Sequence, residues 1–159
     1  MKNLKLTTLT EENCNEYLNF VSEIYNEKDS LMRKYTPGFA AQTKQDYLNI
    51  LESNYHTGST LLGIRLPDDT LIGAIGLDNI FVKGTREVSF AIAKPFRKKH
   101  YATEALALLI QKLRKTDITK LIFTVSKNNT ASLNIIKNKL EATYDHDYEN
   151  NSEVHILDI

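Results

Sequence analysis

The sequence lacks several features that would tie it to a special environment. It has one cysteine, Cys14, which cannot form an intramolecular disulfide, and its place on the apolar stripe of a predicted helix favours a buried side chain over a nucleophile. Twenty basic and twenty acidic residues cancel, which excludes a broad electrostatic attraction to nucleic acid or to an anionic membrane. Residues 1–10 lack the apolar run of a signal peptide or a spanning helix. We therefore expect a cytoplasmic protein with no nucleic-acid partner and no membrane partner.

The sequence contains enough apolar residues to form the core of one globular domain. Its 159 residues are 42% apolar, and no internal repeat, linker or low-complexity segment divides them. We expect a single domain over residues 1–159.

The apolar periodicity predicts four helices. The strongest signal runs from Ala102 to Leu113, where apolar residues recur every three or four positions. Thr10 is suited to capping the first helix, and Asn128 and Asn129 are suited to capping the last. The predicted helices cover residues 11–25, 44–55, 102–113 and 128–140.

Seven extended runs read as strands. The run 86–93 alternates, with Val88, Phe90 and Ile92 on one face and Glu87 on the other. The run 120–125 is almost continuously apolar, which is typical of a strand covered on both faces. Because the order mixes hairpins with crossover helices, it predicts an α+β or mixed α/β fold, without naming a function. The predicted strands cover residues 4–9, 60–66, 70–80, 86–93, 120–125, 141–148 and 153–159.

Four basic residues, Arg97 to His100, directly precede the strongest helix. A helix N-terminus exposes unpaired amides and carries roughly half a positive charge, so it can bind an anion. His100 can add its own backbone N–H if its φ is negative. The alternative is a solvated basic surface around a helix start. The strand before this loop and the amphipathic helix after it favour the anion site.

This stretch and its flanks resemble the GNAT family of acyl-CoA-dependent N-acetyltransferases, in the branch related to ribosomal-protein N-terminal acetyltransferases. The most specific piece is "YATEAL", residues 101–106. The segments "LIGAIGL" and "NNTAS" are similar to neighbouring elements of the family. In element order, the resemblance covers nearly the whole chain.

The family's phosphate loop has the pattern Gln or Arg, two residues, Gly, one residue, then Gly or Ala, which maps onto residues 97–102. Arg97 and Ala102 fit, whereas His100 stands where the family has Gly and Lys98 stands where many members have a second Gly. No glycine follows Gly84, and residues 139–142 read "KLEA" where the family closes its last helix with an "LGF"-like turn.

The resemblance implies an α/β, GNAT-like fold, with a central, mostly antiparallel sheet of about seven strands flanked by about four helices. It also implies acetyl-CoA as co-substrate and no metal. A backbone amide near Ile92 or Ala93 would stabilise the oxyanion. The residues implied in coenzyme binding are Ile92, Ala93, Arg97, Lys98, Lys99, His100, Tyr101, Ala102, Thr103 and Asn129.

Two residues are catalytic candidates by the same resemblance. Glu87 opens the strand along which the family binds the pantetheine arm, and it would be the general base; the alternative is an ordinary polar residue at a strand start. Ser132, three residues after Asn129, would serve the leaving thiol, because the tyrosine of many members is replaced here by Ile136. The alternatives are a first-turn serine and an asparagine that only cap the helix.

The acceptor would be a primary amine, either a peptide N-terminus or a small amino compound, bound by a monomer or homodimer. Met32, Tyr35 and Phe39 lie where the family builds part of its acceptor pocket, although they could simply anchor the loop.

Two rival functions stay open. One is a GNAT-like domain that binds an acyl-CoA or another anion without turnover, and the other is a nucleic-acid module built around "RKKH". "DHD" at residues 145–147 resembles a metal cluster, but strand alternation should point His146 away from Asp145 and Asp147, so we expect a hairpin surface there. His56 and His155 each stand alone and suggest no ligand set.

Overall fold

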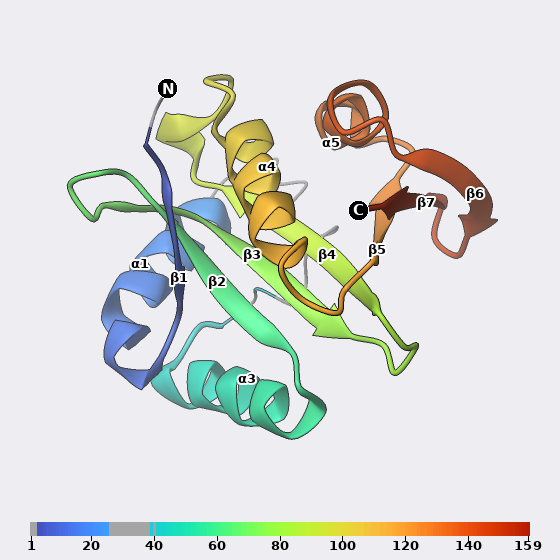
Figure 1. The fold of residues 1–159 in the computed structure, drawn as a ribbon. Coiled ribbons are helices and arrows are strands. Elements are labelled where there is room, and N and C mark those ends of the chain that lie inside the picture. The colour runs from blue at the N-terminus through green and yellow to red at the C-terminus, as the bar shows by residue number, and fades with distance from the viewer. Residues whose placement is uncertain (1–2, 26–38, 40) are drawn as a thin grey trace.

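The computed structural model describes residues 3–25, 39 and 41–159, which fold around one mixed sheet (Figure 1). The strand order is β1-β2-β3-β4-β5-β7-β6. Among the described strands only β4 and β5 pair in parallel, and the other five pairs are antiparallel. The predicted mostly antiparallel sheet of seven strands is confirmed. The strands are β1 Lys5–Thr8, β2 Thr60–Arg65, β3 Leu71–Asn79, β4 Thr85–Ile92, β5 Lys120–Ser126, β6 Thr143–Tyr148 and β7 Ser152–Asp158.

The described helices follow the predicted order, and Thr10 and Asn129 cap the first and last of them as predicted, whereas the cap at Thr43 was not predicted. Thr10 precedes a short 3₁₀ turn that leads into α1, and Thr43 caps α3, where its side chain accepts a hydrogen bond from the Asp46 amide at 3.1 Å. Gly58 ends α3 at φ 74°, a left-handed conformation that glycine adopts at little cost. The helices are α1 Cys14–Tyr25, α3 Lys44–Thr57, α4 Tyr101–Leu113 and α5 Thr130–Asn134, which continues into a π-helical turn, Ile135–Lys139.

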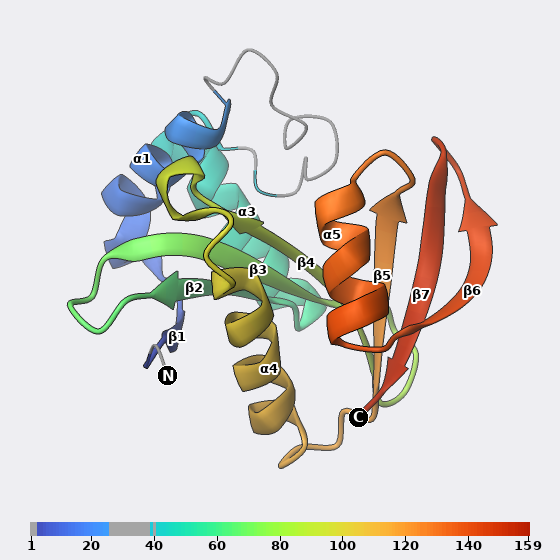
Figure 2. The same cartoon turned by 90° about the horizontal axis from the view of Figure 1, so that it is seen from above.

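Helices cover both faces of the sheet (Figure 2). One core lies under α1 and α3, where Tyr17 and Tyr47 pack near Ala91 of β4. The other core lies under α4 and α5 and contains Val88 and Ile92 of the same strand. The predicted alternation along β4 is therefore present, and this strand contributes to both cores. None of the helices in the described ranges is long and apolar enough to cross a membrane.

Strand β5 differs from the prediction that both of its faces are covered. Leu121, Phe123 and Val125 are buried, but Ile122 is only half-buried and Thr124 is exposed. The reason is that only one face of β5 packs under α4 and α5. The apolar run at this position therefore belongs to a strand with one covered face.

The "DHD" segment lies on the exposed outer strand β6, as expected for a hairpin surface. The expected opposite orientation of Asp145 and His146 is wrong, because the pairing with β7 shifts register between Tyr144 and His146. His146 Nδ1 lies 2.6 Å from Asp145 Oδ2. In the part of the chain that the structure describes, no group of three His, Cys, Asp or Glu side chains could hold a metal.

His155, which suggested no ligand set in the sequence, is fully buried and has a single acidic partner. Its Nε2 lies 2.8 Å from Oε1 of Glu153, and Lys137 Nζ lies 3.4 Å from the same oxygen. These contacts lower the pKa of the Glu153 carboxyl, mainly through the hydrogen bond with His155. The π turn is thereby tied to β7, behind the side of α5 that forms the candidate site.

Candidate functional site

Strands β4 and β5 are neighbours only along their first residues. The parallel pairing ends at Glu87 opposite Ile122, although β4 continues to Ile92 and β5 to Ser126. Beyond Glu87 the two strands separate. Main-chain groups on this side of β4 are then open to a ligand in the gap.

The register of β3 and β4 decides which amides face the gap. The Ala93 N–H donates to the Ile72 carbonyl at 2.8 Å. Because an antiparallel strand alternates its hydrogen bonds, the amides of Ile92 and Phe90 point away from β3 and toward the gap. Ile92 can therefore serve as an amide donor there. Of the two residues expected near the oxyanion donor, Ile92 is the one whose amide faces the gap, because the Ala93 amide is bonded to the residue before β3's paired segment.

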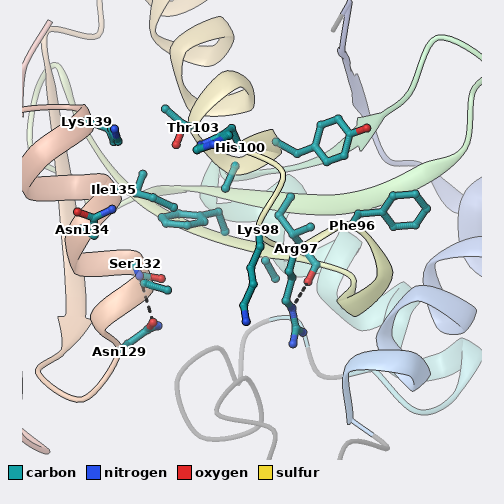
Figure 3. Close-up of a pocket in the computed structure, with 16 residues that line it drawn as sticks. Phe96, Arg97, Lys98, His100, Thr103, Asn129, Ser132, Asn134, Ile135 and Lys139 are labelled. Carbon is teal, nitrogen blue, oxygen red and sulfur yellow. Dashed lines mark hydrogen bonds between the residues drawn. The ribbon is translucent and has the colours of Figure 1, made fainter.

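A cavity of about 550 Å³ occupies this region, between the end of β4, the loop before α4, and α5 (Figure 3). Phe90, Ala91 and Ile92 border it at the end of β4, the strand that contributes to both cores. Nine residues singled out from the sequence line it: Ile92, Arg97, Lys98, His100, Tyr101, Ala102, Thr103, Asn129 and Ser132.

Sequence reasoning missed seven lining residues: Phe90, Ala91, Phe96, Ala131, Asn134, Ile135 and Lys139. Phe90 and Ala91 could have been found by noting that they flank Ile92 at the end of the same strand. Ile135 and Lys139 lie in the π turn, which the helical period does not reveal. Four residues singled out from the sequence do not line the cavity: Glu87, Ala93, Lys99 and Phe39.

The loop before α4 has the backbone shape of a glycine loop without glycine. Lys98 has φ 60° and His100 has φ 64°, and these are the two positions where the GNAT pattern places Gly. His100 therefore does not have the negative φ on which the expected donation of its amide depended. A left-handed residue with a side chain costs roughly 1–2 kcal/mol, so the packed loop must hold both residues in place. The loop therefore adopts positive φ at both positions without glycine, at the cost of backbone strain.

Glu141, just after the π turn, is another residue with a positive φ where the family has glycine, in this case the glycine that closes its last helix. Its φ is 59°. We expect Glu141→Gly to raise the melting temperature, because glycine removes on the order of 1 kcal/mol of backbone strain, equivalent to roughly 2–4 °C in a chain of this size. Glu141→Ala, which removes the side chain and leaves the strain, is the control and should stay close to wild type in a thermal scan. Equal melting temperatures of the two variants would show that the backbone at Glu141 is not strained.

The basic residues of the loop have different surroundings. Arg97 is half-buried, and its Nε donates to the carbonyl of Ile92 at 2.8 Å, so it ties the loop to the end of β4. Lys98 is exposed and lines the cavity. Lys99 is exposed and does not line it. The two lysines are therefore not equivalent, although the sequence alone treats them as a pair.

The start of α5 faces the loop across the cavity. Asn129 caps the helix, with its Oδ1 accepting a hydrogen bond from the Ser132 N–H at 3.2 Å, and both residues line the cavity. Asn129 and Ser132 can therefore cap the helix and contact a ligand in the cavity at the same time. Ile136 is fully buried in the core under α4, so its side chain does not reach the cavity.

Glu87 lies at the last paired position before β4 and β5 separate. It is half-buried on the face of β4 that points to α1 and α3, directly opposite Asp78 of β3. Burial raises the pKa of the Glu87 carboxyl, the nearby Asp78 carboxylate raises it further, and a hydrogen bond with Thr124 of β5 opposes both. A carboxylate with a raised pKa at the junction of the strands is a candidate proton acceptor.

The sequence of this chain matches a known protein family. Residues 3–139 match the family model described as an acetyltransferase (GNAT) domain. The chain belongs to the GNAT acetyltransferase family. No curated protein matches the sequence.

Solved structures of GNAT acetyltransferases share the fold over almost the whole chain. RimL, described as a ribosomal L7/L12 α-N-protein acetyltransferase in complex with coenzyme A, is 13% identical with a TM-score of 0.78 and covers 100% of this chain and 96% of its own. A ribosomal-protein-S5-alanine acetyltransferase from Vibrio fischeri is 11% identical (TM-score 0.76; coverage 98% and 93%). A spermidine N-acetyltransferase chimera from Vibrio cholerae and hSSAT is 13% identical (TM-score 0.71; coverage 97% and 94%).

The residues predicted for the acceptor pocket of this GNAT chain are only partly described. Met32 and Tyr35 lie outside the described residues. Phe39 is 3% exposed and packs in the core under α1, where its carbonyl accepts a hydrogen bond from the Tyr17 hydroxyl at 3.0 Å. This position fits the anchoring of the loop, and the role of Phe39 in acceptor binding stays a prediction.

Proposed function

We propose that this chain transfers an acetyl group from acetyl-CoA to a primary amine, by direct attack in a ternary complex within one domain, residues 1–159. The observation that carries the proposal is the cavity of about 550 Å³ at the separation of β4 and β5, bordered by the N-terminus of α4. A cavity of this size is in the range of cofactor sites.

The residues present fit acetyl-CoA. The open edge of β4 offers the N–H and carbonyl of Phe90 and the N–H of Ile92 to an arm that contains amide bonds, while the Ile92 carbonyl accepts its hydrogen bond from Arg97. The first turn of α4 and the cationic Lys98 offer a positive environment for a pyrophosphate. Glu87 lies on the same strand, at the point where β4 and β5 separate, so a long ligand that runs along the open edge of β4 from the start of α4 points toward it.

The reaction joins the amine nitrogen to the acetyl carbonyl carbon and breaks the carbon–sulfur bond, so one proton must leave the amine and one must reach the thiolate. Glu87 accepts the amine proton, directly or through water. The Ile92 N–H lies five residues along β4 from Glu87, about 16 Å at the rise of a strand, so it serves the pantetheine arm and not the carbonyl oxygen beside the base. Ser132 donates a proton or hydrogen bond to the departing sulfur from the opposite wall.

The acceptor in this proposal is a peptide N-terminus or a small amino compound. Structural neighbours described as ribosomal-protein acetyltransferases support the first, and a neighbour described as a spermidine N-acetyltransferase supports the second. An α-amine has a pKa of ~7.8 and a lysine-type amine a pKa of ~10.4. A small amino compound of the second kind is almost fully protonated at neutral pH, so its acetylation depends more on the general base than that of a peptide N-terminus. We propose a monomer or homodimer in the cytoplasm.

One observation favours a second candidate, a GNAT domain that binds acyl-CoA with little turnover. The position that carries a proton-donating tyrosine in many members is the buried Ile136 here. Thioester cleavage measured with a panel of peptide and small amines separates the candidates. Amine-dependent release of free CoA supports the enzyme, and coenzyme binding without release across the panel supports the second candidate.

Acetyl-CoA should raise the melting temperature of the purified protein. A ligand that binds only the folded state, at a hundredfold over its Kd, adds about 2.7 kcal/mol, which corresponds to roughly 5–10 °C for a chain of this size. The measurement is a thermal scan with acetyl-CoA, with ATP at the same concentration as the control for a generic nucleotide. The absence of any shift at millimolar acetyl-CoA would remove the basis of the proposed function.

A further inference from the structure

One cation of the cavity lies apart from the phosphate loop. Lys139 is exposed and lines the cavity from the end of the π turn, and it makes no ion pair with any residue that the structure describes. Lys137, two residues earlier, points to the other side, where it pairs with Glu153 at 3.4 Å. The π turn, in which the Leu140 N–H donates to the Ile135 carbonyl at 2.9 Å, is wider than an α-helical turn and places Ile135 and Lys139 on the cavity side.

Lys139 and Asn129 stand at opposite ends of the wall that α5 and the π turn form. Asn129 caps the start of α5 and Lys139 is the last residue of the π turn, so the full length of this helical segment separates them. In Figure 3, Lys139 lies opposite Thr103 of the first turn of α4, whereas Asn129 lies at the other end of the same wall. The cavity therefore has a cationic end on the α4 and α5 side of the sheet.

The direction of a bound coenzyme follows from the other residues. Glu87, the base of the proposed function, lies at the junction of β4 and β5, so the proposed function directs the acyl end toward that junction. The pyrophosphate fits the N-terminus of α4. The remaining anionic group of coenzyme A, the phosphomonoester on the ribose, belongs to the nucleotide end and carries a charge between −1.5 and −2, as phosphomonoesters do near pH 7.

We propose that Lys139 recognises this ribose phosphomonoester and makes the site selective for coenzyme A over 3′-dephospho-coenzyme A. The inference rests on the proposed function, because it assumes a coenzyme in the cavity. The Lys139 ammonium donates to the phosphate, and the exposed position allows this contact without burial of an unpaired charge.

Calorimetric titration of coenzyme A and 3′-dephospho-coenzyme A at low salt tests the proposal. We expect wild type to prefer coenzyme A by ~3- to 10-fold, the range for a charge-assisted contact at a partly exposed site. Lys139→Gln should bring the two affinities to within about twofold by weakening coenzyme A alone. Lys139→Arg should keep the preference, and so should Lys137→Gln, which changes the net charge equally but lies outside the cavity.

The outcomes are separable. A preference that survives in Lys139→Gln, or an equal loss of both ligands, overturns the role of Lys139 while leaving the proposed function in place. Failure of both ligands to bind wild type overturns the proposed function itself. The readout is binding, so it does not depend on finding the amine acceptor.

Discussion

Glu87→Gln is expected to lower turnover with an amine acceptor by roughly 100-fold, the contribution of one general base. Glutamine keeps the shape of the side chain but cannot take up the proton of the attacking amine. Acetyl-CoA affinity should change little, because Glu87 does not line the cavity. Steady-state thioester cleavage gives the first quantity, and calorimetric titration gives the second.

The same variant should be at least as stable as wild type at neutral pH. Burial and Asp78 raise the pKa of Glu87, so ionisation is harder in the folded chain than in the unfolded one. Stability linked to this carboxyl is complete below its unfolded pKa and falls as pH rises through the raised folded pKa. Thermal scans should therefore show Glu87→Gln at or above wild type near pH 7, with the advantage disappearing in acid. A lower melting temperature with unchanged turnover between pH 6 and 9 would assign Glu87 to structure.

Asp78→Asn is the matched variant on the neighbouring strand. It removes the like charge opposite Glu87, so the pKa of Glu87 should fall and the acid limb of kcat/KM should move to lower pH. The amine acceptor is the same in both measurements, so the shift reports a group on the protein. A limb that does not move would mean that Glu87 is not the titrating base.

The order of elements could be read from the sequence because each element carries its own periodic signal. The heptad-like spacing in α4 and the alternation in β4 each bury one face, and the structure uses both. The prediction that both faces of β5 are covered was wrong for a physical reason. Three consecutive apolar residues do not show which face of the strand another layer will cover. The burial of Ile122 and Thr124 depends on elements distant in sequence.

The geometry of the site was only partly accessible from the sequence. The basic loop follows from a local pattern, and Asn129 as a site residue follows from the family resemblance. The separation of β4 from β5 depends on how far two strands stay paired, which no local pattern encodes. Lys98 and His100 look incompatible with a glycine loop, yet both adopt positive φ. A missing glycine therefore indicates strain at these positions and does not by itself indicate a different backbone. The spacing of apolar residues predicts a regular helix through this segment, so neither the π turn nor the position of Lys139 on the cavity wall could be predicted from it.

Reversing the charge of Lys98 should weaken coenzyme binding far more than reversing that of Lys99. Lys98 lines the cavity, so Lys98→Glu removes a cationic contact and adds repulsion with the phosphates. We expect a loss of about 30-fold at low salt, equivalent to about 2 kcal/mol. Lys99→Glu gives the same change in net charge at a neighbouring position outside the cavity, and it should stay within about threefold of wild type. Calorimetric titration of coenzyme A into the three proteins is the measurement.

Salt separates a direct contact from a diffuse field. The Debye length falls from about 10 Å at 0.1 M to about 3 Å at 1 M, so exposed charges act over much shorter distances in high salt. Wild-type affinity should weaken as salt rises because the Lys98 contact is screened, and the gap between wild type and Lys98→Glu should narrow because the repulsion is screened as well. Backbone donors at the start of α4 depend less on salt and should preserve part of the affinity. Equal losses in Lys98→Glu and Lys99→Glu at every salt concentration would show that the loop acts only through its total charge, and would remove the specific role of Lys98.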